Sequence, residues 1–263
     1  MQYDIALKTL LENSKFVFFK EILGVTITEA EILEELPQET VSVKRTDYPV
    51  LVKDGKGKEE IYLVEFQTEW SEEKILDMLE YKARYMRKFH KPVHSVYVLL
   101  NSNKNSTNEY SDEEVKFQFQ LVKIWELEAE KYLNLDESLL PLIPLFRNGL
   151  NYVKEIERKL YESRNKNHLD MLTIFGLLLG LRNKEAVGEF FRRRKDIMIQ
   201  SPMYDMILEE GIEKGKLEGK LEGKLEGKLD DARKMIAKGS DLEFVFEITG
   251  LTMEDLRREG IVD

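Results

Sequence analysis

The chain has 263 residues, with 50 Asp or Glu against 40 Lys or Arg, so its formal net charge is −10 at pH 7. A hydrophobic content of 42% is enough for a core, and with only 15 glycines and 6 prolines the chain is neither collagen-like nor wholly disordered. The lack of cysteine excludes disulfides, thiolate metal sites and a cysteine nucleophile. Three histidines make a histidine-rich metal site unexpected. No signal-peptide pattern or long uncharged apolar run is present, so we expect a soluble, cytoplasmic protein without a membrane partner.

The first half of the chain switches between helical and extended patterns. Gly24 is expected to end the first helix, and Ser71 to open the second. Asp54-Gly55, between two β-rich runs, predicts a hairpin. In chain order we expect a helix over 4–23, a period-two segment from about Glu39 to Val52, a turn over 53–58, a strand over 61–67, a helix over 71–89, a buried strand over 93–100 and a further strand over 117–124. This order predicts an α/β core.

The second half reads as mainly helical. Helices are expected over 151–164, 168–182 and 184–200, followed by a Gly-Lys-Leu-Glu repeat from Gly215 to about Leu229 and short helices over 232–238, 242–249 and 253–259. We therefore predict four regions: an α/β domain over 1–130, a helical region over 131–205, the repeat as helix or linker over 206–230, and a small helical tail over 231–263.

Two carboxylates and an amide are the candidate site of the predicted hairpin. Residues two apart on a strand share a face, so Glu65 and Gln67 point together. Pairing Lys53 with Glu59 places Asp47 opposite Glu65, and a slip of one residue would destroy that arrangement. The same register gathers an apolar set on the other face: Tyr48, Val50, Val52, Tyr62, Val64 and Phe66. The apolar pattern therefore favours the register that brings the two carboxylates together.

Such carboxylates are costly to bury without compensation, and a divalent cation compensates them naturally. Oxygen ligands from Asp47 and Glu65 suit Mg²⁺ or Mn²⁺, which would lower the pKa of a bound water and neutralise charge on a phosphoryl group. On the spacing alone, ordinary solvent-facing strand residues are the alternative interpretation.

A family resemblance then adds to this pattern. Asp4-Ile5-Ala6-Leu7-Lys8, Arg45-Thr46-Asp47, Val64-Glu65-Phe66-Gln67 and Met78-Leu79-Glu80-Tyr81, with Pro92-Val93 before an apolar strand, resemble the PD-(D/E)XK nuclease superfamily. More narrowly, they resemble the Rpn family of recombination-promoting nucleases and transposases. The resemblance covers about residues 1–125, and the repeat with the Thr249–Thr252 tail is similar to that family as well.

The resemblance implies a restriction-endonuclease-like α/β core followed by a helical C-terminal region, acting as a Mg²⁺-dependent DNA endonuclease. It implies Asp47 and Glu65 as metal ligands, with Gln67 as the third catalytic residue in the place usually held by lysine. An amide can orient a water but cannot exchange a proton, so water activation would depend on the metal or the substrate phosphate. The alternative is a catalytically weak or inactive nuclease fold that binds DNA or protein.

Two further segments carry expectations about partners. Arg84, Arg87, Lys88 and Lys91 follow i, i+3, i+4, i+7 spacing and form a basic stripe that would contact DNA phosphates, or else a solvated face. The apolar side of the same helix is expected at Leu76, Leu79, Ala83 and Met86. The repeat carries separate Lys, Leu, Glu and Gly stripes if helical, and its four glycines weaken a lone helix. We read 211–230 as a segment for homodimer formation, or as a flexible linker. The tail permits a helix-turn-helix or a plain helical cap.

Overall fold

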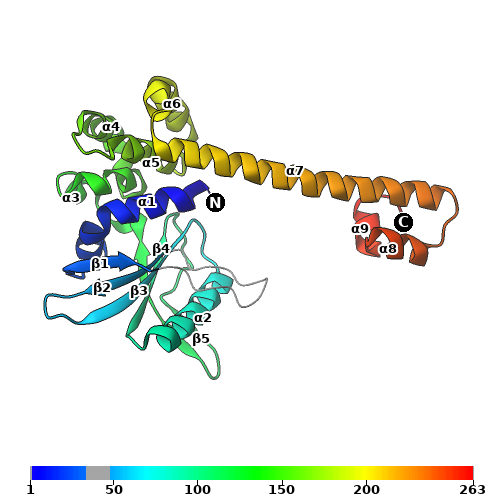
Figure 1. The fold of residues 1–263 in the computed structure, drawn as a ribbon, viewed down its shortest axis with the longest axis horizontal. Helices are drawn as coiled ribbons and strands as arrows, with labels where there is room; N and C mark the ends of the chain where they lie inside the picture. Colours follow the sequence, from blue (N-terminus) through cyan, green and yellow to red (C-terminus); the bar gives the residue numbers. More distant parts are fainter. Residues whose placement is uncertain (1, 34–47, 263) are drawn as a thin grey trace. The chain divides into compact units, whose positions relative to one another are not determined.

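The computed structural model describes residues 2–33 and 48–262 (Figure 1). The first half contains, in order, α1 (Gln2–Val17), the π-helix η1 (Phe18–Ile22), β1 (Glu29–Ile32), β2 (Tyr48–Lys53), β3 (Glu59–Gln67), α2 (Glu72–Phe89), β4 (Val93–Leu99), β5 (Glu109–Ser111), β6 (Lys116–Gln118) and β7 (Gln120–Lys123). The fold of this half is mixed α/β, as the element order predicts. Gly24 follows the first helix with φ +72°, a conformation that favours glycine, so it ends that helix as expected.

A five-stranded mixed sheet in the order β1-β2-β3-β4-β7 forms the centre of this half. β1 and β2, and β2 and β3, pair antiparallel, whereas β3 and β4, and β4 and β7, pair parallel. β3 is therefore flanked on both edges, and α2 makes the crossover that parallel pairing with β4 requires. A glutamate and a glutamine near the end of β3 consequently lie in the interior of the sheet.

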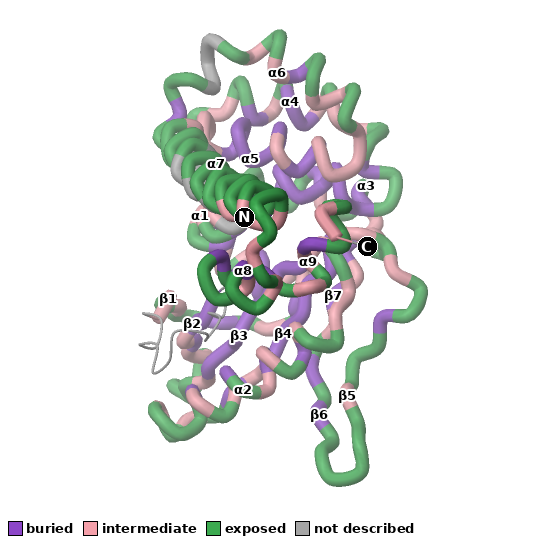
Figure 2. The backbone as a smooth tube through the Cα atoms, turned by 90° about the vertical axis from the view of Figure 1, so that its right-hand side faces the viewer, coloured by how far each residue is buried: buried purple, intermediate pink, exposed green. Residues whose placement is uncertain are grey.

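Two helical layers cover the two faces of the sheet. The rings of Phe18 and Phe19 in η1 pack against Phe66 and Tyr62, at centroid distances of 5.8 and 5.1 Å, so the first helix covers the face that those residues share. On the other face, Tyr81 and Tyr85 of α2 pack with Ile61, Leu63 and Val93. Figure 2 shows buried backbone along β3 and β4 and also in the helical region around α5 (His168–Gly180).

Two strand predictions need correction. A single strand was expected over 117–124, but the chain is divided there: β6 pairs with β5 in a separate two-stranded sheet, and β7 pairs with β4. Phe119 lies between them, buried, with its N–H on the carbonyl of Asn108 at 3.1 Å. β1 was not expected at all, and the period-two segment predicted from Glu39 falls mostly outside the described residues.

Helices dominate the rest of the chain. They are the 3₁₀ helix η2 (Ile124–Glu126), α3 (Ala129–Tyr132), the 3₁₀ helices η3 (Glu137–Leu145) and η4 (Gly149–Tyr152), α4 (Val153–Glu162), α5 (His168–Gly180), α6 (Lys184–Met198), α7 (Pro202–Ala237), α8 (Leu242–Thr249) and α9 (Met253–Arg258). α1 packs against both α5 and η3, which joins the helical region to the sheet domain. Arg193 and Arg194 bind the buried carboxylate of Glu157 at 2.9 and 2.8 Å, so part of the basic run at the end of α6 serves to hold α6 on α4.

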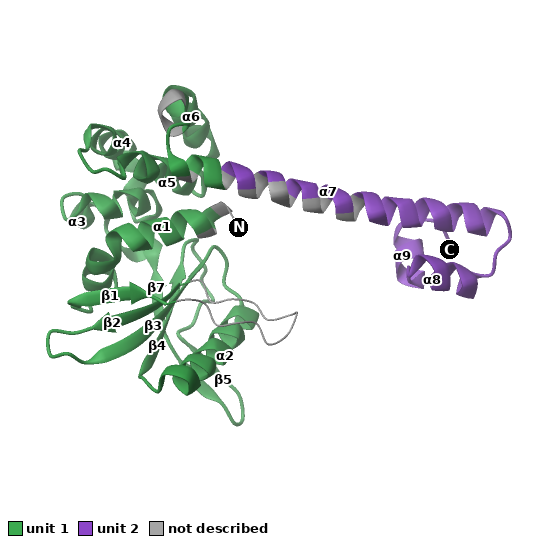
Figure 3. Ribbon diagram, viewed as in Figure 1, with its two compact units in different colours: residues 1–206 green, residues 207–263 purple. Residues whose placement is uncertain are grey.

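Two compact units make up the chain, residues 1–206 and 207–263 (Figure 3). In the second unit, Leu229 and Ala232 of α7 form a small core with Val245, Leu251 and Leu256. The Gly-Lys-Leu-Glu repeat lies within α7, which is helical from Pro202 to Ala237. In the tail, Thr252 and Asp255 form a capping box that begins α9.

Candidate functional site

Glu65 and Gln67 lie side by side near the end of β3 and are both buried. Only 5% of Glu65 and 8% of Gln67 is exposed, so neither is an ordinary solvent-facing strand residue. The amide Nε2 of Gln67 donates a hydrogen bond to Oε1 of Glu65 at 2.8 Å. A carboxylate removed from water in this way requires polar partners, because burial disfavours its charged form. The amide supplies one partner.

The hairpin register is the one that the sequence predicts. Lys53 pairs with Glu59 and Tyr48 pairs with Val64, so the residue numbers of each pair in the β2–β3 ladder sum to 112. The third predicted site residue, Asp47, lies outside the described residues. The structure therefore brings Glu65 and Gln67 together and gives the register of the strand that follows Asp47.

The opposite face of the hairpin is apolar, also as predicted. The rings of Tyr48 and Phe66 meet at 5.5 Å, and Phe66 in turn contacts Phe18 of η1. Tyr62 and Val64 are buried on this face too. Since a slip of one residue would exchange the two faces, this packing holds Glu65 and Gln67 on the side of α2.

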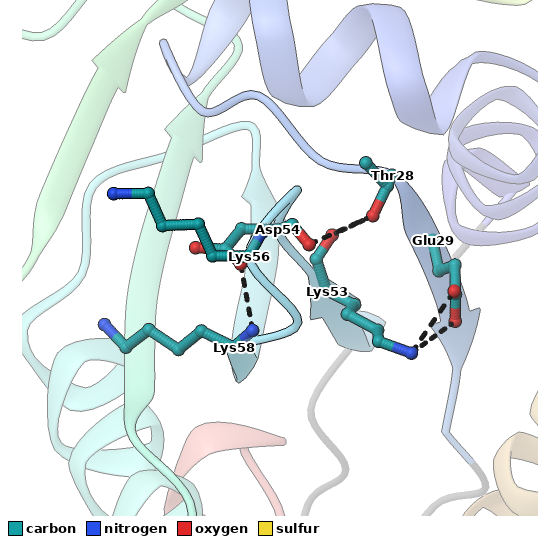
Figure 4. Close-up of polar contacts among 6 residues, drawn as sticks. All are labelled: Thr28, Glu29, Lys53, Asp54, Lys56 and Lys58. Atoms are coloured by element: carbon teal, nitrogen blue, oxygen red, sulfur yellow. Dashed lines mark hydrogen bonds and ion pairs between the residues drawn. The ribbon is translucent and has the colours of Figure 1, made fainter.

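The hairpin turn reinforces the register through one carboxylate (Figure 4). Oδ1 of Asp54 accepts the backbone N–H groups of Lys56 and Lys58 at 2.8 and 2.9 Å, and these hydrogen bonds lower the pKa of Asp54. Gly57 adopts φ +83°, which the turn requires. At the end of β2, Nζ of Lys53 forms an ion pair with Glu29 of the neighbouring strand β1 at 3.3 Å. Both backbone donors go to the same carboxylate oxygen, which indicates a structural role for Asp54 in the turn.

α2 covers the site face, but with a different side from the one predicted. Ile75, Met78, Tyr81 and Tyr85 are buried, whereas Leu76 is 42% and Met86 47% exposed. Ala83 is also exposed, and Leu79 is only partly buried. The prediction that Leu76, Leu79, Ala83 and Met86 form the packed side is therefore wrong. Met78 packs with Tyr97 and Leu99, the β4 partners of Glu65 and Gln67, so α2 lies directly over the site.

On α2, the pKa of the Tyr81 hydroxyl is affected by the charge of Glu65. Burial is the largest cause that raises the pKa of the Tyr81 hydroxyl, and the negative charges of Asp77 and Glu65 raise it further. The phenol is consequently neutral at physiological pH. Asp77 lies one helical turn before Tyr81, and its carboxylate is within 3.9 Å of Lys74 Nζ. Two carboxylates and a neutral phenol thus share this part of the sheet–helix interface.

The predicted basic stripe is only partly present. Arg87 and Lys88 are exposed in the last turn of α2, while Arg84 is half-buried and 4.0 Å from Glu80. The helix ends at Phe89, where His90 takes a left-handed conformation, so the helical spacing does not continue to Lys91. Lys91 instead binds Glu59 at 2.8 Å. A continuous four-residue stripe is therefore not formed.

The histidines lie away from this face. The ring of His94 stacks on Tyr62 at 4.6 Å, and its Nε2 is 3.4 Å from Glu60. Tyr62 belongs to the face covered by η1, opposite Glu65. His90 caps α2, and Nδ1 of His168 is 2.8 Å from the carbonyl of Asn165. These contacts agree with the expectation that the histidines are structural or exposed.

The donor set at Glu65 fits a hard cation. A carboxylate and an amide oxygen on one strand are ligands that Mg²⁺ and Mn²⁺ accept, and both are removed from bulk solvent. Across residues 2–33 and 48–262, no group of three or more His, Asp or Glu side chains is arranged to hold a metal ion. Glu65 and Gln67 by themselves therefore do not complete a metal site.

No family model matches the chain, and neither the curated proteins nor the solved structures contain a significant match to it. In the described part of the chain, no helix has the length and apolar character needed to cross a membrane.

Tyr81 is the residue of this site that the sequence pattern did not single out as functional. Its spacing with Met78 and Tyr85 is helical, so the sequence carries a signal for its burial on α2. Its position over Leu63 and near Glu65 depends on the tertiary packing of α2 on β3.

Proposed function

We propose that this protein is a Mg²⁺-dependent endonuclease that hydrolyses DNA phosphodiester bonds, of the recombination-promoting, transposase-like class. The observation that carries the proposal is the buried Glu65–Gln67 pair on a strand whose register with β2 is now known. Continuing that register by one position would pair Asp47 with Glu65. The resemblance of these segments to the PD-(D/E)XK nucleases supports the same assignment.

In this proposal Asp47 and Glu65 hold the metal, with Mn²⁺ as a substitute for Mg²⁺. When bound, the ion would lower the pKa of a coordinated water and neutralise charge on the phosphoryl group. Gln67 orients the attacking water through its amide while its Nε2 restrains the Glu65 carboxylate. Because an amide does not take up a proton at neutral pH, Gln67 does not act as the general base. The water proton must leave to bulk water or to a phosphate oxygen.

DNA contacts are proposed for the basic residues near the site. Arg87 and Lys88 are exposed and available to phosphates. Arg84 and Lys91 would have to exchange their contacts with Glu80 and Glu59 for phosphate oxygens. The net charge of −10 disfavours strong nonspecific affinity, so we expect weak, salt-sensitive, metal-dependent DNA binding.

Homodimer formation through residues 211–230 is part of the proposal. One metal site cuts one strand at a time, so two copies related by a two-fold axis are the simplest route to a double-strand break. The repeat is helical, and Leu225 is 42% exposed on it. An exposed leucine in a glycine-rich helix supports pairing with a second helix.

The decisive experiment is incubation of supercoiled plasmid with the purified protein in Mg²⁺ or in EDTA. We expect nicking with Mg²⁺ alone, abolished in Asp47→Ala and Glu65→Ala. Glu60→Gln is the matched control, because Glu60 lies on the same strand but binds Lys58 and His94 instead of facing the site. Equal nicking by wild type and Asp47→Ala would show that the site is wrongly assigned.

The second candidate function is a nuclease fold that binds DNA or protein without cutting. Gln67 favours it, because the amide that replaces the usual lysine cannot exchange a proton and is committed to Glu65. Calorimetry separates the two: DNA binding retained without any Mg²⁺ or Mn²⁺ binding would favour the binding module.

A further inference from the structure

The basic run at the end of α6 belongs to a positively charged part of the helical region. Residues 153–198, which span α4 to α6, carry 11 Lys or Arg against 7 Asp or Glu, a net charge of +4 in a chain whose net charge is −10. α4 and α6 both pack on α5, which in turn packs on α1, whereas α2 and the Glu65 face lie on the other side of the sheet (Figure 1). This positive charge is therefore separate from the candidate site.

Arg194 is held in one orientation by two groups of α4. Its Nε donates to Oε1 of the buried Glu157 at 2.8 Å, and its guanidinium carbon lies 4.3 Å from the centroid of the Tyr161 ring. Nη1 and Nη2, the two terminal nitrogens, make no hydrogen bond with the described residues, and 25% of the side chain is exposed. The ion pair and the ring thus orient the guanidinium group and leave its terminal pair of donors for an oxyanion.

Arg193 and one face of α4 extend the same positive charge. Arg193 binds Glu157 as well, at 2.9 Å, so two guanidinium groups share one buried carboxylate. On α4, Lys154, Arg158 and Tyr161 follow i, i+4, i+7 spacing, which places them on one side of the helix, and all three are exposed. We call Lys154, Arg158, Tyr161, Arg193 and Arg194 the α4–α6 basic surface.

The acidic neighbours of this surface are exposed and loosely paired. Glu162 lies 4.0 Å from Arg158, and Glu189 lies 3.7 Å from Arg193, with 63% and 65% of the two glutamate side chains exposed. Exposed ion pairs of this kind contribute little free energy, so phosphate oxygens can displace them.

We propose that the α4–α6 basic surface is a second DNA-binding site, in which Arg194 binds the oxygens of one phosphate bidentately while Lys154, Arg158 and Arg193 contact neighbouring phosphates. The inference takes DNA as the partner from the proposed function, but it does not depend on cleavage. A phosphate backbone presents oxyanions in series and can engage several separated cations at once, which a single free anion cannot. DNA bound here lies across the sheet from Glu65, so it is bound in addition to the segment that is cut.

The test is the binding of a short labelled duplex in EDTA, followed by fluorescence anisotropy at several salt concentrations. The variant Lys154→Ala/Arg158→Ala removes two exposed cations. Arg147→Ala/Lys184→Ala is the matched control, because it removes the same two residue types from exposed positions outside the surface. Each neutralised phosphate contributes about 0.9 to the slope of log K against log salt, so the first variant should lower that slope by about 2 and weaken binding at least about tenfold. The control should bind as wild type does.

A third variant tests the geometry at constant charge. Arg194→Lys keeps a cation opposite Glu157 but offers a point charge in place of two terminal donors, so DNA affinity should fall at least about fivefold. Urea denaturation shows whether each variant is folded as wild type is.

The outcomes separate this inference from the proposed function. Wild-type affinity and salt slope in Lys154→Ala/Arg158→Ala would overturn the inference, even if plasmid is nicked as proposed. Competition by polyglutamate as effective as that by DNA at equal charge would assign the surface to an acidic protein segment and overturn the choice of DNA. The expected losses of binding, together with no nicking by wild type in Mg²⁺, would support the inference and overturn the proposed function.

Discussion

Gln67 donates its amide Nε2 to Oε1 of Glu65 across 2.8 Å, and both side chains are buried on the face of β3 that α2 covers. This contact gives the glutamine a definite structural role beside the one proposed in catalysis. It also separates this chain from a site with lysine in the same place, where the partner of Glu65 would be charged.

Replacing Gln67 should show which role dominates. Gln67→Ala leaves Oε1 of Glu65 without its amide donor, so we expect a loss of about 1–3 kcal/mol in the free energy of unfolding. Gln67→Lys restores a donor that is charged and can exchange a proton, and should raise the cleavage rate at least about tenfold. Urea denaturation and plasmid nicking measure the two effects. No gain in cleavage by Gln67→Lys would contradict a limiting role for the missing ammonium group.

Paired truncations on α2 should confirm which side of that helix is packed. Met78→Ala removes a side chain that is 1% exposed and should cost about 2–5 kcal/mol of unfolding free energy. Leu76→Ala removes one that is 42% exposed and should change stability by at most about 0.5 kcal/mol. Chemical denaturation of both variants under the same conditions makes the comparison. Equal losses would mean that Leu76 is covered in solution.

The turn carboxylate of Asp54 makes the stability of the hairpin depend on pH. Its pKa is lowered in the folded state by the N–H groups of Lys58 and Lys56, so its stabilising effect is complete above the unfolded value of about 3.9 and is lost as pH falls through the lower folded value. Asp54→Ala should therefore lower the urea midpoint at pH 7, and the difference from wild type should shrink below the folded pKa. Asp54→Asn keeps an acceptor oxygen without charge, and should lie between the two at pH 7. A difference that is constant across this range would contradict the assignment.

Removing the repeat should separate association from chemistry. A chain lacking 211–230 should sediment as a smaller species than the full chain, because the repeat with its exposed Leu225 is lost, and it should nick plasmid while yielding less linear product. Analytical ultracentrifugation and gel analysis of plasmid products give the two readouts. If the variant that lacks 211–230 is still fully dimeric and still linearises plasmid, the repeat acts only as a spacer.

Local alternation was enough to predict the hairpin and its register. The hairpin lies within twenty residues of chain, including the turn residues Asp54 and Gly57 and the apolar positions of β2 and β3. Its register is therefore set by local sequence, which is why the pattern predicts it. By contrast, both Leu76/Leu79/Ala83/Met86 and Ile75/Met78/Tyr81/Tyr85 have helical spacing, and only packing against β4 decides between them.

The other differences between the predicted and observed strands also arise from tertiary contacts. β1 is a short edge strand whose residues alternate between exposed and half-buried, and its pairing with β2 is a tertiary contact without a strong local pattern. The split at Phe119 likewise arises because β6 and β7 belong to different sheets. The packing of Tyr81 against Ile61 and Leu63 could not be predicted, because it follows from how α2 lies on β3.

The mixed pairing of β3 also implies an order of events during folding. Its ladder with β2 closes over a short turn, whereas its ladder with β4 forms only after α2 has crossed the sheet. Short-range hairpins form within microseconds, while non-local parallel pairing is slower because more chain entropy is lost first. We therefore expect the amides of β2 and β3 to gain protection from hydrogen exchange before those of β4 during refolding. Glu65 would then acquire its place in the hairpin early, and lose its contact with bulk water late, when α2 docks.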